Sequence, residues 1–113
     1  MTYAEHLRDL HRSVSEWSAL AGFSIESHGD GTEPDEPWLT IHSAAGRVTF
    51  EPASFAADRS PTVIRVYAFP TLRQVQLVGP IAGAWEFRST QGIPFRVKWN
   101  QTGFGLMMSD LLQ

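Results

Sequence analysis

Short segments in which apolar and polar residues alternate follow one another from residue 39 to residue 99, and no other feature constrains the fold as strongly. A turn at residues 43–46 sets Ile41 opposite Val48, and the same register keeps the apolar residues of both segments on one face. A slip of one residue would turn that face to water. The agreement therefore predicts an antiparallel hairpin with one buried face.

The same pattern predicts a second hairpin. A turn at residues 70–71 sets Val66 opposite Val75, again with the apolar side chains on a common face. Residues 52–61, which contain two prolines, are expected to cross from the first hairpin to the second. Two strand pairs thus share one buried face.

Two more strands complete the predicted meander. Taking residues 79–83 as a loop sets Val75 opposite Phe87, and a turn at 90–92 then sets Phe87 opposite Phe95. The second turn has a glycine where a three-residue hairpin needs a left-handed residue. Four consecutive strands then agree in register.

The last strand of this meander, residues 93–99, is expected at an edge of the sheet. The predicted register sets Pro94 opposite Arg88, and proline lacks the N–H that a central strand donates. The first hairpin should therefore join the sheet at the other end. Residues 23–26 are expected to form a further short strand.

An amphipathic helix is predicted at the N-terminus. Its apolar residues recur at steps of three and four, which places them in one stripe: Tyr3, Leu7, Leu10, Val14, Trp17 and Ala21. Gly22 follows as the left-handed residue that ends such a helix, with Phe23 placed to fold back on the last turn. We expect this stripe to pack on the apolar face of the sheet.

A second, short helix is predicted near the C-terminus, because Phe104, Met107, Met108 and Leu111 have helical spacing. Its apolar side has two candidate positions, the sheet and a partner molecule, since methionine pairs occur on adaptable binding surfaces. The predicted fold of residues 1–113 is a single α+β domain. In it, the N-terminal helix packs on a curved antiparallel meander of six to seven strands, and a short C-terminal helix follows.

The composition of the 113 residues excludes several classes of function. Cysteine is absent, which removes disulfides, zinc–cysteine sites, iron–sulfur clusters and thiol nucleophiles. The net charge of −3 disfavours binding to nucleic acids in general. Neither a membrane-spanning run nor a signal peptide is visible, so we expect a cytoplasmic protein without membrane contact.

The face predicted to meet the N-terminal helix carries no aspartate, glutamate or histidine. A pocket enzyme needs such a group, with its pKa shifted toward the working pH by burial. The sequence also has no nucleophile elbow and no phosphate-binding loop. We therefore expect no catalysis and no cofactor. One metal alternative stays open at the acidic loop, a cation site formed by His28, Asp30, Glu33 and Asp35.

These exclusions favour a small non-catalytic binding or adaptor module that binds a protein partner or forms a homo-oligomer. The predicted partner-binding residues lie on the outer face of the sheet and beside the acidic loop: Arg65, Tyr67, Arg88, Arg96 and Trp38. The alternative is a cone-like cavity beneath the N-terminal helix that binds a small apolar molecule, with weak or no activity. RNA binding on the sheet face is a third reading, which a single outward aromatic residue, Tyr67, disfavours.

Carrying the register across the meander gives the polar rows of the outer face. One row comprises Arg65, Gln76, Glu86 and Arg96, and the next comprises Tyr67, Gln74, Arg88 and Pro94. Glu86 and Arg96 are expected to form a cross-strand pair. Residues 1–58 carry ten acids and three bases, a net charge of −7, whereas residues 59–113 carry six bases and two acids, a net charge of +4. The arginines therefore suit an acidic partner, which includes the acidic half of a second copy.

Overall fold

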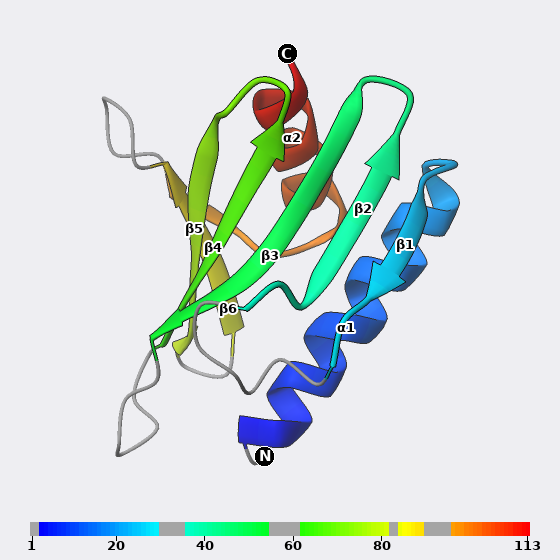
Figure 1. The fold of residues 1–113 in the computed structure, drawn as a ribbon. Helices are drawn as coiled ribbons and strands as arrows, with labels where there is room; N and C mark the ends of the chain where they lie inside the picture. Colours follow the sequence, from blue (N-terminus) through cyan, green and yellow to red (C-terminus); the bar gives the residue numbers. More distant parts are fainter. Residues whose placement is uncertain (1–2, 30–35, 55–61, 82–83, 90–95) are drawn as a thin grey trace.

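The computed structural model describes residues 3–29, 36–54, 62–81, 84–89 and 96–113 (Figure 1). Helix α1 comprises Tyr3–Leu20, and helix α2 comprises Gln101–Leu112. Between them lie seven strands: β1 (Ser24–Ser27), β2 (Leu39–Ser43), β3 (Gly46–Ser54), β4 (Thr62–Phe69), β5 (Gln74–Ile81), β6 (Ala84–Ser89) and β7 (Arg96–Lys98).

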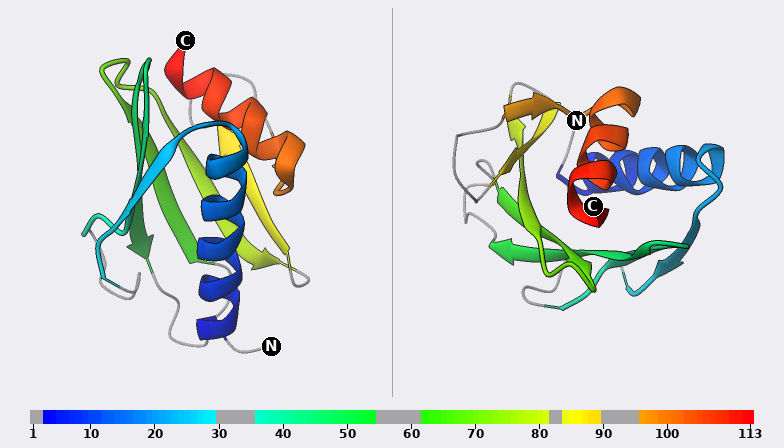
Figure 2. Two further views of the ribbon diagram at one scale, coloured as in Figure 1. Left: turned by 90° about the vertical axis from the view of Figure 1, so that its right-hand side faces the viewer. Right: turned by 90° about the horizontal axis from the view of Figure 1, so that it is seen from above.

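The strands form one antiparallel sheet in the order in which they occur along the chain, from β1 at one edge to β7 at the other. The sheet is open and curved, and both helices lie on its concave side (Figure 2). This architecture confirms the predicted α+β meander between two helices. Within the described residues, no helix is both long and apolar enough to cross a membrane.

The first two predicted hairpins have the expected register. Ile41 is opposite Val48 in β2 and β3, and Val66 is opposite Val75 in β4 and β5. These residues are all buried, as a sheet with one covered face requires.

The register of the β5–β6 pair differs from the predicted one by two residues. Leu77, instead of Val75, lies opposite Phe87. The expected loop at 79–83 is shorter, because β5 continues to Ile81 and its register shifts between Val78 and Ile81. A shift of two residues keeps every side chain on its predicted face, since the strand period is two.

The β6–β7 pair differs by two residues as well. Phe87 lies opposite Val97 instead of Phe95, and Arg88 lies opposite Arg96 instead of Pro94. The connection itself, residues 90–95, lies outside the described residues. Strand β7 is an edge strand as predicted, although Pro94, on which the argument rested, lies outside the described residues.

The segment predicted to cross between the hairpins belongs partly to the sheet. Strand β3 continues through Pro52, which lies opposite Ile64, and reaches Ser54. A register shift between Pro52 and Ser54 marks a bulge, where a strand tolerates a proline. The prediction was wrong for this part, and residues 55–61 lie outside the described chain.

Helix α1 buries the predicted stripe through Leu7, Leu10 and Val14. It ends in a Schellman motif at Gly22, whose φ is +80°. The N–H of Gly22 donates to the carbonyl of Ala19 at 3.1 Å, and that of Phe23 donates to the carbonyl of Ser18 at 2.8 Å. The chain therefore reverses at the predicted position, so that β1 runs back beside α1.

Helix α2 begins at an N-cap, because the side-chain oxygen of Asn100 accepts a 2.7 Å hydrogen bond from the Gly103 N–H. Its four predicted apolar residues are buried against the sheet and α1. The Phe104 ring lies 5.8 Å from that of Trp17 and 5.9 Å from that of Trp99, between centroids. The sheet and α1 cover the apolar side of this helix.

Trp38 lies in the core, and not on the outer face or the loop side, where the partner-binding interpretation placed it. Its side chain is 2% exposed, and its ring lies 6.2 Å from that of His11 on α1. Trp38 precedes the first residue of β2, so the alternation of the strand does not determine its direction. Its N–H donates to the carbonyl of Phe50 at 2.8 Å, which holds the residue against β3.

The burial of Leu10 on α1 gives a direct test of this fold. Leu10 is 1% exposed, so Leu10→Ala should lower the free energy of unfolding by about 2–5 kcal/mol. Leu20→Ala is the matched control, because Leu20 on the same helix is 73% exposed and should cost less than about 0.5 kcal/mol. Urea denaturation of the two variants measures the difference, and equal losses would contradict the placement of α1.

Candidate functional site

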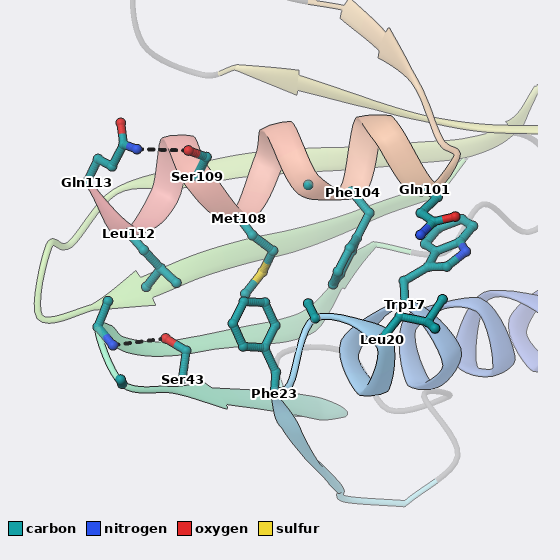
Figure 3. A pocket seen from close by; sticks show the side chains of 14 residues that line it. Trp17, Leu20, Phe23, Ser43, Gln101, Phe104, Met108, Ser109, Leu112 and Gln113 are labelled. Carbon is teal, nitrogen blue, oxygen red and sulfur yellow. Dashed lines mark hydrogen bonds between the residues drawn. The ribbon is translucent and has the colours of Figure 1, made fainter.

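An apolar hollow of about 590 Å³ lies at one end of the molecule, between the end of α1, the β2–β3 turn and α2 (Figure 3). Its larger apolar lining residues are Trp17, Leu20, Phe23, Phe104, Met108 and Leu112. The side chains of Phe23 and Met108 point toward one another across it. The hollow thus brings together three segments that are far apart in the sequence.

The end of α1 creates this hollow. The reversal at Gly22 leads the chain into β1, the edge strand of the sheet, and places Phe23 at the side of the hollow. Helix α2 covers the middle of the concave face instead, where it contacts β3, β4 and β5. The two helices therefore leave a gap between the C-terminal end of α1 and the last turns of α2.

The lining of the hollow is uncharged. None of its fourteen lining residues, all within the described chain, has an ionisable side chain. Two of its polar side chains already have hydrogen-bond partners: Ser43 donates to the Gly46 carbonyl at 3.0 Å, and Ser109 lies 2.9 Å from the Gln113 amide nitrogen. Such a site can hold an apolar group, but it offers no acid, base or charged ligand for chemistry.

The sequence argument anticipated a cavity only as an alternative and placed it beneath the N-terminal helix. The hollow lies beside the end of that helix instead. Leu20 falls outside the predicted stripe, and its 73% exposure at the rim is the feature that the stripe did not explain. An apolar residue off the stripe and next to the helix-ending glycine was the available signal.

Two of the predicted partner-binding residues, Arg65 and Tyr67, contact the same glutamate on the convex face. The Arg65 guanidinium lies 2.8 Å from Oε1 of Glu51, and the Tyr67 hydroxyl donates to Oε2 of the same carboxylate at 3.1 Å. Glu51 is opposite Arg65 in the register of β3 and β4. The positive charge of Arg65 is therefore largely balanced within the protein.

The other predicted arginines lie in one row with Arg65. The two-residue shifts align Arg65, Gln76, Arg88 and Arg96 across β4 to β7. The predicted pairing of Glu86 with Arg96 is wrong, because Glu86 lies opposite Lys98. Glu86 instead contacts Arg88 of its own strand at 3.5 Å.

The sequence argument missed a second outward aromatic residue. Phe69 is 49% exposed at the end of β4, and the Arg47 guanidinium lies 4.6 Å from the centre of its ring. Phe69 shares its face with Tyr67, two residues earlier, because Ala68 between them is buried. The alternation of β4 was a sufficient signal for this residue.

The structure does not test the cation site proposed for the acidic loop. His28 is described, and its Nε2 lies 2.8 Å from Oε1 of Glu26. Asp30, Glu33 and Asp35 lie outside the described residues. Within the described part of the chain, no group of three or more histidine, aspartate or glutamate side chains could hold a metal ion.

Comparison of the chain with protein-family models, with curated proteins and with solved structures finds no match.

The Tyr67–Glu51 hydrogen bond predicts a pH dependence. Burial raises the pKa of Tyr67 above its ordinary value of 10.0, and the Glu51 carboxylate, which accepts a hydrogen bond from the Tyr67 hydroxyl, raises it further. The folded protein therefore keeps this proton at a pH where the unfolded chain loses it. The contribution of Tyr67 to stability is complete below about pH 10 and is lost as the pH rises through its folded pKa.

Ultraviolet titration of the phenolate tests this prediction. In a Tyr3→Phe background, Tyr67 is the sole remaining tyrosine, and it should titrate above its ordinary pKa. Adding Glu51→Gln should lower this pKa, whereas Glu16→Gln on α1 should leave it unchanged. An unchanged titration in the Glu51 variant would contradict the assigned cause.

Proposed function

We propose that this protein is a small non-catalytic binding module whose apolar hollow takes a small, uncharged, apolar molecule. The observation that carries the proposal is the lining of the hollow, in which no residue has an ionisable side chain. A charged ligand would lose its hydration there without gaining a partner. An apolar ligand gains from every apolar surface that it covers.

The size of the hollow supports a small molecule as its occupant. Its volume of about 590 Å³ lies within the range of roughly 300–1,000 Å³ that is typical of ligand sites. Its polar side chains, which include Gln101 and Ser109, are few, as in sites where hydrogen bonds orient a mostly apolar ligand. That the module works in the cytoplasm stays a prediction.

A matched pair of leucine variants tests this function. Leu20→Lys places an ammonium group at the rim of the hollow, whereas Leu106→Lys makes the same change on α2 at a residue that does not line it. Both leucines are half or more exposed, so both variants should fold. We expect 1-hexanol to raise the melting temperature of the native chain and of the Leu106 variant equally, and to stabilise the Leu20 variant much less.

Three results would overturn the proposal. One is that 1-hexanol fails to stabilise the native chain, and another is that both lysine variants respond alike. The third is that sedimentation shows a dimer that Leu20→Lys dissociates, because the hollow would then be an interface between copies.

A protein partner on the convex face is the second candidate, and the corrected register favours it. Arg65, Arg88 and Arg96 lie in one row across β4 to β7, with Gln76 of β5 between the first two, which concentrates basic residues more than the predicted two rows did. The acidic half of a second copy is the partner that the charge division of the chain suits. RNA is a weaker candidate, since Glu26, Glu51 and Glu86 on the same face would repel phosphates.

Charge reversal tests the second candidate. Arg88→Glu with Arg96→Glu should convert a dimer into a monomer in sedimentation velocity, while Arg8→Glu with Arg12→Glu on α1 should not. A native chain that sediments as a monomer at every concentration, or a reversal that leaves a dimer intact, would contradict this interface.

A further inference from the structure

A second hollow, of about 700 Å³, lies on the convex face of the sheet, away from the apolar hollow. Glu26, Thr40, Thr49 and Tyr67 are aligned across β1 to β4. The two short threonine side chains in the middle of this row form the floor. Longer side chains surround them, which include His28, Arg47 and Tyr67. A depression therefore forms on a face that is otherwise convex.

The hydroxyl groups on the floor have hydrogen-bonding capacity to spare. Thr40 and Thr49 are each 7% exposed, so they have little contact with water. Their oxygens lie 3.4 Å apart, and that of Thr40 lies 3.5 Å from Nε2 of His28. Both distances are long for a hydrogen bond, because hydroxyl pairs prefer roughly 2.7–2.8 Å. The side chain of Thr49 also hydrogen-bonds with Tyr67. The contacts of the Thr40 hydroxyl are therefore the weak ones, which a ligand in the hollow could replace.

Arg47 supplies a positive charge at the same hollow. Its guanidinium lies over the Phe69 ring, and among the described residues no carboxylate lies within ion-pair distance of it. Arg65 and Arg88, by contrast, each contact a glutamate. The contact with Phe69 holds the planar group in place and leaves its N–H groups available.

We propose that this polar hollow binds the carboxylate group of a small molecule. Arg47 would balance the charge, and the hydroxyls of Thr40 and Thr49 would donate hydrogen bonds to the oxygens. A carboxylate matches the fork of a guanidinium, and such charge-assisted bonds are stronger than neutral ones. A doubly charged phosphate fits less well, because Glu36 lines the hollow and Glu26 and Glu51 lie next to its lining residues.

This inference does not depend on the proposed function, because the two hollows lie on opposite faces of the sheet. A ligand with an apolar body in one hollow and a carboxylate in the other is excluded by the sheet between them. The second hollow therefore takes a separate, polar ligand.

Two-dimensional nuclear magnetic resonance of the full chain tests the carboxylate site. Sodium acetate, added at constant ionic strength, should cause saturable shifts at the backbone amides of Thr40, Arg47 and Thr49. Acetamide, which has the same shape without the charge, should not shift them. Arg47→Gln should weaken acetate binding by about tenfold, and Arg47→Lys by less, since lysine keeps the charge but not the fork.

Two control variants complete the test. Arg12→Gln removes a charge from α1 and should leave acetate binding unchanged, whereas Thr49→Val removes a floor hydroxyl with little change of shape and should weaken it. Shifts that do not saturate, equal shifts with acetamide, or equal losses in the Arg12 and Arg47 variants would overturn the proposal. Tighter binding of inorganic phosphate than of acetate would overturn the carboxylate assignment.

Discussion

Burial of one face of a seven-stranded antiparallel sheet is the constraint on which the rest of this structure depends. The meander keeps its apolar side chains on the concave side, and two helices on that side exclude water from them. Because the sheet curves, a single helix leaves part of the face uncovered. Helix α1 packs near β1, and α2 packs on β3 to β5. The apolar hollow lies between the end of α1 and α2, where neither helix covers the concave face.

The concave face of the sheet is apolar and the convex face is polar, so the two faces suit different classes of ligand. On the concave side, the described lining of the hollow is uncharged, so recognition there depends on shape and apolar contact. On the convex side, Glu51 forms an ion pair with Arg65 and accepts a hydrogen bond from Tyr67. Arg47 lies over the Phe69 ring, and no described carboxylate forms an ion pair with it. The protein therefore offers an apolar site and a polar site that cannot share one ligand.

Register parity explains why so much of the fold was predictable. The β5–β6 and β6–β7 pairs differ from prediction by two residues each, yet Leu77 and Phe87 are buried as expected. A register shift of two residues leaves each side chain on its predicted face. The predicted core therefore stays correct, and only the neighbours of the surface residues change. The surface rows did change, and with them the neighbours of Arg88 and Glu86. A register error of two residues thus changes predicted cross-strand pairs but not predicted burial.

The sequence alone determined the order of the elements, the apolar stripe of α1, its end at Gly22 and the buried face of strands β2 to β6. All of these follow from local periodicity and backbone preference. Only the tertiary structure decided the direction of Trp38, the pairing of Arg65 with Glu51 and the two hollows. Trp38 precedes its strand, so no alternation fixes its side. Gly46 is a second example. Its φ of +152° suits a turn, which is a local property. A Cβ at this position would also meet the carbonyl oxygen of Phe69 from the next hairpin, and this contact depends on the tertiary structure. Such contacts join residues distant in the chain, and they exist only once the sheet has curved and the helices have packed.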